Sequence, residues 1–134
     1  MFTGDEGKII QTSDANKLKE VHKKKKEQII KDGKDNYIEA EFFGLNTFNK
    51  LMDTFKPDCV GFRVYYGSRM EKHDGAKVEA TSDNSGKNTS RLIIVPVDKY
   101  GNDLRLPRGM KDGEGTGMAY GPTCPHNCAP PTSD

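Results

Sequence analysis

The sequence predicts an α+β fold in which two helices pack on a small antiparallel β-sheet, followed by a long Gly/Pro-rich C-terminal tail. Two segments with helical spacing of apolar residues come before two segments with strand character, which is typical of this class. The 14 glycines and 7 prolines are concentrated toward the C-terminal end. With 134 residues, 33% of them hydrophobic and 31% charged, the chain is long enough for one domain with a small core. We expect an arm over residues 1–12, a single domain over 13–106 and a tail over 107–134.

The first helix is expected over residues 12–33, "TSDANKLKEVHKKKKEQIIKDG". Thr12, Ser13 and Asp14 are N-cap candidates, and Gly33 is a suitable stop. The apolar stripe of this segment is thin, which predicts a helix that lies on the domain surface.

The second helix is expected over residues 45–55, "LNTFNKLMDTF". Apolar residues recur there at steps of three and four and form one face: Leu45, Phe48, Leu51, Met52 and Phe55. Lys56 precedes Pro57, and the residue before a proline avoids helical geometry, so the helix ends there. The preceding "NYIEAEFFG", residues 36–44, is expected to be extended.

The clearest strand is "CVGFRVYYG", residues 59–67. Its alternation directs one set of side chains toward the core and Arg63 and Tyr65 the other way; the inward set is Val60, Phe62, Val64 and Tyr66. The second strand, "RLIIVPVD" at 91–98, is almost continuously apolar, which predicts burial on both faces. Pro96 is then expected near a strand end, an edge or a bulge, because it has no N–H to donate. A turn at "KYGND" and a short third strand at "LRL" follow.

Residues 68–91 are expected to be a long loop, since they contain almost no regular apolar pattern. From Pro107 onward the chain has no periodicity and cannot pack a core alone, so the tail is expected to lie on the outside or to extend from it. The predicted core is Phe48, Leu51, Phe55, Phe62, Val64, Ile93, Val95 and Val97.

The order of these motifs resembles a family of small uncharacterised bacterial proteins with no established activity. The shared features are a helix leading into a "cVGxRxYyG" strand, a "lxxVxVDxxGxD" strand and turn, and a C-terminal pair of cysteines after a proline. In this sequence they correspond to "CVGFRVYYG", "LIIVPVDKYGNDL" and "CPHNC". The resemblance covers about residues 12–66, 91–104 and 120–128, and it implies an architecture without a mechanism.

Charge and composition argue against several function classes. The net charge is +1, which is unlike a surface built for nucleic acid. No apolar run approaches the roughly 20 residues that span a bilayer, and the acidic N-terminus is unlike a signal peptide. We therefore expect a soluble, cytoplasmic protein, a location that disfavours structural disulfides. Lysines 23–26 are expected to form a solvated helix face, with a weak contact to nucleic acid or an acidic partner as the alternative.

Three residues near the C-terminus, Cys124, His126 and Cys128, are candidate zinc ligands. Thiolates and imidazole suit zinc, but a structural site needs a fourth ligand. It could come from another subunit or from one of three residues elsewhere in the chain: Cys59, His73 and His22. Alternatively, Cys124 and Cys128 form a small disulfide ring. The simplest interpretation is a tail with free thiols.

A second candidate site is an anion-binding fork formed by Arg63, Tyr65 and Arg69. The competing interpretation is that Arg63 forms an ion pair with an acidic residue across a covered face; the candidates are Glu39, Glu41 and Asp98. The inventory for catalysis is thin, because the sequence has no phosphate-binding loop, no serine elbow and no HExxH helix. Cys59 is expected to be a buried structural thiol.

The leading hypothesis is a non-enzymatic interaction or self-assembly module whose partner is another protein or a second copy of the chain. A zinc-binding protein that uses Cys124, His126 and Cys128 is the first alternative, with zinc as its only cofactor. The second alternative is an enzyme or binder that acts on an anionic ligand through Arg63, Tyr65 and His73. Neither nucleic acid nor a membrane is an expected partner.

Overall fold

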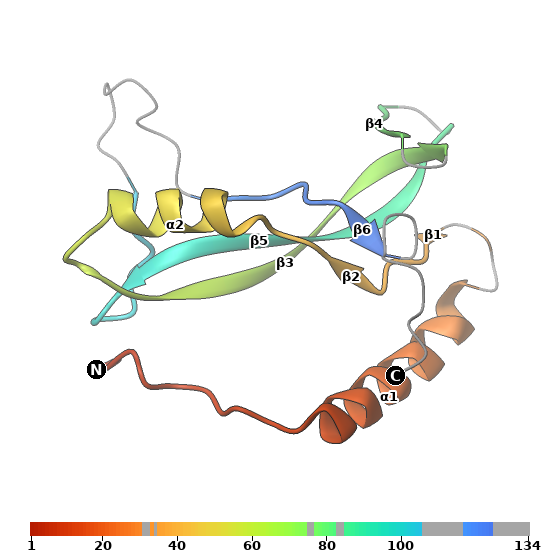
Figure 1. Cartoon of the computed structure of the whole chain (residues 1–134). Helices are drawn as coiled ribbons and strands as arrows, with labels where there is room; N and C mark the ends of the chain where they lie inside the picture. Colours follow the sequence, from red (N-terminus) through yellow and green to blue (C-terminus); the bar gives the residue numbers. More distant parts are fainter. Residues whose placement is uncertain (31–32, 34, 75–76, 83–84, 106–116, 125–134) are drawn as a thin grey trace. The chain divides into compact units, whose positions relative to one another are not determined.

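A computed structural model describes residues 1–30, 33, 35–74, 77–82, 85–105 and 117–124 (Figure 1). Its elements in chain order are α1 (Thr12–Ile30), β1 (Asp35–Asn36), β2 (Ala40–Glu41), α2 (Leu45–Thr54), β3 (Cys59–Asp74), β4 (Lys77–Ala80), β5 (Lys87–Asp98) and β6 (Thr123–Cys124). One sheet has the order β1-β5-β3-β4, and β2 pairs with β6 in a second sheet. The α+β class is confirmed. The larger sheet is mixed, because β1 pairs with β5 in parallel while β4 pairs with β3 antiparallel.

The chain divides into two compact units, and both β3 and β5 contribute to each of them. The first unit consists of Met1–Gly7, Phe43–Gly67 and Arg91–Gly121, and the second of Lys8–Phe42, Ser68–Ser90 and Pro122–Asp134. Each unit is described by itself below.

The core of the first unit is built around β5. Four consecutive residues of this strand are buried: Ile94, Val95, Pro96 and Val97. Since neighbouring side chains of a strand point to opposite faces, β5 is covered on both faces, as its apolar run predicts. Phe55, at the end of α2, and Met118 complete the buried hydrophobic set.

Pro96 lies where one edge of β5 changes its pairing partner. Ile94 exchanges two backbone hydrogen bonds with Met118, at 3.0 and 2.9 Å, and the Leu104 N–H donates to the Pro96 carbonyl at 2.9 Å. Pro96 lies between these two contacts, so its missing N–H breaks no hydrogen bond of the β-ladder. This agrees with the expectation that the proline lies at an edge of the pairing.

The expectation that the tail from Pro107 onward lies on the outside of the domain does not hold at Met118, which is buried. A single methionine among glycines carries no periodicity, so the sequence pattern could not reveal it. Gly117 allows the close approach: a Cβ atom at this position would lie 3.0 Å from the Ile94 carbonyl oxygen. Residues 107–116 of the predicted tail lie outside the described residues.

The prediction that the Phe62, Val64 and Tyr66 face of β3 points into the core is also wrong. α2 contacts this face through Phe48, whose ring meets the Phe62 ring edge-on with centroids 5.0 Å apart. Even so, Phe62, Val64 and Tyr66 are 51%, 41% and 91% exposed. Strand alternation separates the two faces of β3 but does not say which of them is covered. Among the other predicted core residues, Phe55, Val95 and Val97 are buried, whereas Phe48, Leu51 and Ile93 are half-buried.

In the second unit, the segment predicted as a long loop forms strands instead. β3 continues to Asp74, β4 returns antiparallel beside it with Glu71 opposite Ala80, and β5 already begins at Lys87. The loop prediction for 68–91 failed because these strands are polar and therefore lack the apolar alternation that marks a strand.

The cysteine end of the second unit is also a strand. β6 pairs antiparallel with β2, with Cys124 opposite Ala40. The flanking backbone extends the pairing, since the Glu39 N–H donates to the Cys124 carbonyl at 2.9 Å and the Phe42 N–H to the Pro122 carbonyl at 2.7 Å.

α1 lies beside β1 in the second unit and is exposed along most of its length, as its thin apolar stripe predicts. Among the described residues, no helix has both the length and the apolar character that crossing a membrane requires.

The burial of Met118 can be tested by truncation. We expect Met118→Ala to lower the free energy of unfolding by about 2–5 kcal/mol, because it leaves a cavity beside Ile94. Urea unfolding followed by circular dichroism measures the loss. Leu45→Ala is the control, since Leu45 is 69% exposed and its truncation should change the value by no more than about 0.5 kcal/mol. Equal midpoints for the two variants would place Met118 outside the core.

Candidate functional site

Every side-chain arrangement that bears on function involves β3. Alternate residues of its first half form an apolar face, which we call the apolar β3 stripe: Phe62, Val64 and Tyr66. The residues between them join Asp103 in the Arg63 cluster: Arg63, Tyr65 and Asp103. The second half of the strand carries the Glu71 cluster: Arg69, Glu71 and His73.

A turn after β5 positions Asp103 for the Arg63 cluster. The Asp98 carboxylate accepts hydrogen bonds from the Tyr100 and Asn102 backbone N–H groups, both at 2.9 Å. These bonds, led by the one from Asn102, lower the pKa of Asp98. Gly101 has a φ of +88°, and a Cβ atom there would lie 3.0 Å from the Phe2 ring, so both the conformation and the space favour glycine. The turn brings Asp103 opposite Val97.

In the Arg63 cluster, the polar groups of β3 bind the residues of this turn. Arg63 Nη1 donates to Asp103 Oδ1 at 2.6 Å, and Arg63 Nη2 donates to the Gly101 carbonyl at 3.2 Å. The Tyr65 hydroxyl donates to the other Asp103 oxygen at 2.5 Å. Hydrogen bonding to Tyr65 and then to Asp103 raises the pKa of Arg63.

The structure thus brings together two of the three residues of the expected anion-binding fork, Arg63 and Tyr65, but not Arg69. It pairs Arg63 with Asp103, which was not among the expected acidic partners. The signal that could have identified Asp103 is the last aspartate of "VPVDKYGND", because the turn glycine brings that residue back beside the strand.

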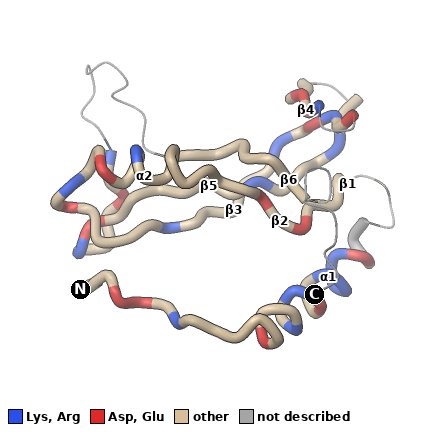
Figure 2. The backbone as a smooth tube through the Cα atoms, in the orientation of Figure 1, with Lys and Arg blue, Asp and Glu red and all other residues tan. Residues whose placement is uncertain are grey.

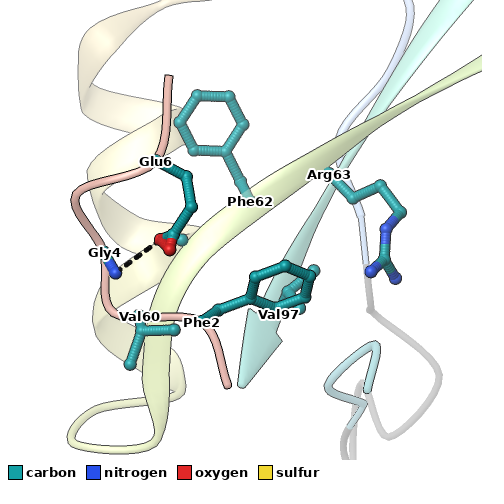
Figure 3. A pocket seen from close by; sticks show the side chains of 8 residues that line it. Phe2, Gly4, Glu6, Val60, Phe62, Arg63 and Val97 are labelled. Atoms are coloured by element: carbon teal, nitrogen blue, oxygen red, sulfur yellow. Dashed lines mark hydrogen bonds between the residues drawn. The ribbon is translucent and has the colours of Figure 1, made fainter. Parts of the chain in front are cut away.

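Arg63 also lines a pocket of about 330 Å³ in the first unit. Figure 3 shows Phe62 and Arg63 on opposite sides of β3, and Phe2 and Val97 also line the pocket. The Glu6 carboxylate at the rim accepts backbone hydrogen bonds from Thr3 and Gly4, and these bonds lower the pKa of Glu6 to about 2. Both charged groups of the pocket therefore bind groups of the protein itself, and the rest of the lining is mainly apolar.

The Glu71 cluster is buried within the second unit. The Glu71 side chain is fully buried, with Arg69 Nε 2.5 Å from one carboxylate oxygen and His73 Nε2 2.9 Å from the other. The three residues are two positions apart, so they share one face of β3. Asn36 joins them from β1: its side-chain amide donates to the Glu71 carbonyl at 3.2 Å and to the hydroxyl of buried Thr89 at 2.8 Å.

This arrangement suits a structural role for the Glu71 cluster, because a buried carboxylate is tolerated only when charged and hydrogen-bonding partners surround it. It holds β1, β3 and β5 together by polar contacts. Arg69 and His73 are candidates for ligand binding in the sequence, whereas Glu71, which both of them contact, is not predicted. The charged residues at alternate positions in "RMEKH" were the available signal.

The candidate zinc ligands are only partly described. Cys124 is disulfide-bonded, Cys59 is a free thiol near the Gly61 carbonyl, and His126 and Cys128 lie outside the described residues. His73 contacts Glu71, and His22 is exposed on α1. Within the described part of the chain, no three His, Cys, Asp or Glu residues are grouped closely enough to hold a metal ion.

The basic helix α1 does not form a single charged stripe. Its six lysines are spread around the helix and accompany three acidic residues, and four consecutive lysines point in all directions. Figure 2 shows charged residues gathered on α1 and near β4, whereas the middle of β3 and β5 carries few.

The apolar β3 stripe lies on a strand whose outer edge is unpaired within the described part of the chain. β5 is the neighbour on one side of β3, and β4 on the other side pairs only with residues 71–74. The next contact along that edge is the Met70 carbonyl, which accepts from Thr81 N–H. At the opposite end, Gly4 of the N-terminal arm lies against the Val60 carbonyl. Residues 61–67 between these limits form what we call the open β3 segment.

Comparisons with family models, with curated proteins and with solved structures found no match to this chain.

The structural role of Glu71 predicts a large effect for a small change. Glu71→Gln keeps the shape but leaves Arg69 and His73 without their buried carboxylate, so we expect a loss of about 3–5 kcal/mol in unfolding free energy. The control is Glu79→Gln on β4, which removes an exposed ion pair with Lys77 and should cost at most about 1 kcal/mol. Urea denaturation of both variants gives the comparison, and equal losses would contradict the structural role.

The two described cysteines should differ in their reaction with iodoacetamide. In unfolded protein without reductant we expect alkylation of Cys59 but not of Cys124, and alkylation of both after reduction, because Cys124 is in a disulfide. Mass spectrometry of the proteolytic peptides distinguishes the two residues. Alkylation of Cys124 without reductant, together with one zinc ion per chain, would support the zinc hypothesis instead.

Proposed function

We propose that this protein is a non-enzymatic interaction module, and that the apolar β3 stripe is the surface through which it binds another protein chain. The observation that carries the proposal is the exposure of three alternate apolar residues on one face of a strand: Phe62, Val64 and Tyr66. A contiguous apolar strand face with an unpaired edge is uncommon on a protein that acts alone, and such faces mark interaction sites.

The arrangement of the polar groups supports the same proposal. Arg63 and Tyr65 bind Asp103, and Arg69 and His73 bind Glu71. A catalytic or anion-binding group must be able to reach a ligand, whereas these side chains are used to hold strands and a turn in place. An interaction surface needs only a rigid backbone beneath it, and both clusters contribute to that rigidity.

Photo-crosslinking tests the proposal. Tyr66 is replaced by the photoreactive p-benzoylphenylalanine, the protein is expressed in the cells that normally produce it, and the cells are irradiated. We expect a defined covalent adduct, because Tyr66 is the most exposed residue of the stripe. The adduct is identified by mass spectrometry.

The control places the same photoreactive residue at Tyr100, an exposed tyrosine in the turn after β5. The proposal requires that position 66 give adducts that position 100 does not give. Equal labelling at the two positions, or none at either, would rule out the stripe as a binding surface.

A further inference from the structure

We propose that the partner is a second copy of this chain, and that two copies join by antiparallel pairing of their open β3 segments about a two-fold axis at Val64. This inference rests on the proposed function, because pairing of the two edges brings the apolar β3 stripes of the two copies side by side. It goes beyond it by naming the partner, the mode of contact and the register.

Within the described part of the chain, the open β3 segment presents an unpaired hydrogen-bonding edge. An unpaired strand edge presents a row of N–H and C=O groups that another strand can bind. In the described part of the chain, β4 covers this edge of β3 at residues 71–74, and the N-terminal arm reaches it at Val60. Natural edge strands are usually protected by inward-pointing charges, lysines or prolines. The open β3 segment contains no lysine or proline, and its one charged residue, Arg63, binds Asp103.

The open β3 segment, "GFRVYYG", has a self-complementary sequence. When two copies pair antiparallel about Val64, Val64 faces Val64 of the second copy. Phe62 then faces Tyr66, and Gly61 faces Gly67. Aromatic and β-branched pairs of this kind stabilise neighbouring strands. A two-fold contact requires such self-complementarity, because each surface must match itself.

Charge disfavours the neighbouring register that is centred on Arg63. A two-fold axis perpendicular to the sheet keeps the apolar β3 stripes of the two copies on the same face. Directly opposite residues must share a face, so even-numbered residues pair with even-numbered residues. The axis therefore passes through the position of a residue and not between two residues. Centring the axis on Arg63 would place two guanidinium groups opposite each other, which is destabilising. With Val64 at the centre, Arg63 instead faces Tyr65 of the second copy.

Cysteine crosslinking tests the register. In a Cys59→Ser background we introduce Val64→Cys, Phe62→Cys or Tyr66→Cys and oxidise the folded protein mildly. We expect Val64→Cys to form covalent dimers alone, because residues directly opposite lie within about 4.5–5.5 Å at Cβ. Phe62→Cys and Tyr66→Cys should crosslink poorly alone but efficiently when mixed. Crosslinking that does not follow this pattern would overturn the register.

Light scattering over a concentration series tests the dimer itself. We expect the unmodified chain to dimerise and Val64→Lys to raise the dissociation constant by roughly tenfold or more, because it places two like charges opposite each other. Tyr100→Lys, on the exposed turn, should dimerise as the unmodified chain does. Circular dichroism establishes that both variants are folded.

The outcomes separate this inference from the proposed function. A monomer at every concentration that is nevertheless crosslinked through position 66 to a different protein would overturn the self-pairing and leave the interaction module standing. A monomer that gives no adduct at position 66 would overturn both. A dimer that persists in Val64→Lys would show that the copies join elsewhere.

Discussion

The burial of four consecutive residues of β5 is the constraint on which the first unit depends. Because adjacent side chains of a strand point to opposite faces, Ile94 to Val97 can be buried together only if both faces are covered. Two further buried side chains come from sequence on either side of β5: Phe55 precedes the strand, and Met118, which pairs with Ile94 at its edge, follows it. The segment around Met118 must therefore return to the strand, although its composition resembles that of a free tail.

The packing of β5 also determines which edge of that strand is available to β3. One edge of β5 is taken by the Met118 segment and by Leu104, so β3 occupies the other edge. β3 then becomes the outer strand over residues 61–67, and its own far edge is left without a described partner. Its polar side chains Arg63 and Tyr65 bind Asp103, whereas its apolar side chains stay exposed even though Phe62 meets the Phe48 ring. The exposed stripe thus results from how β5 is packed.

Much of the fold follows from local patterns in the sequence. The segment predicted as a helix between Thr12 and Gly33 contains α1, and the three- and four-residue spacing from Leu45 identifies α2. The apolar run at 91–98 gives both the position of the second half of β5 and its burial. The features of the fold that local patterns could not predict depend on residues that are far apart in the sequence. Asp103 acts on Arg63 from 40 positions away, and the polar strands β4 and β5 near Glu71 are stabilised by contacts rather than by apolar alternation. Met118 was missed for the same reason.

In the candidate site, too, the local sequence pattern identifies the faces of β3 but not which of them is buried. Alternation in "VGFRVYYG" correctly separates an apolar face from the face that carries Arg63 and Tyr65. Taken alone it implies that the apolar face is core, because most apolar faces are. The structure assigns burial to β5 instead, so the three alternate residues predicted to point into the core form an exposed surface. An exposed apolar face costs solvation free energy in proportion to its area. A second strand paired at the edge of β3 would bring each apolar side chain against a cross-strand neighbour and would satisfy the backbone groups of that edge. The interaction hypothesis thus rests on apolar residues that the fold leaves exposed. Their apolar character can be read from the sequence, but their exposure is determined by long-range packing.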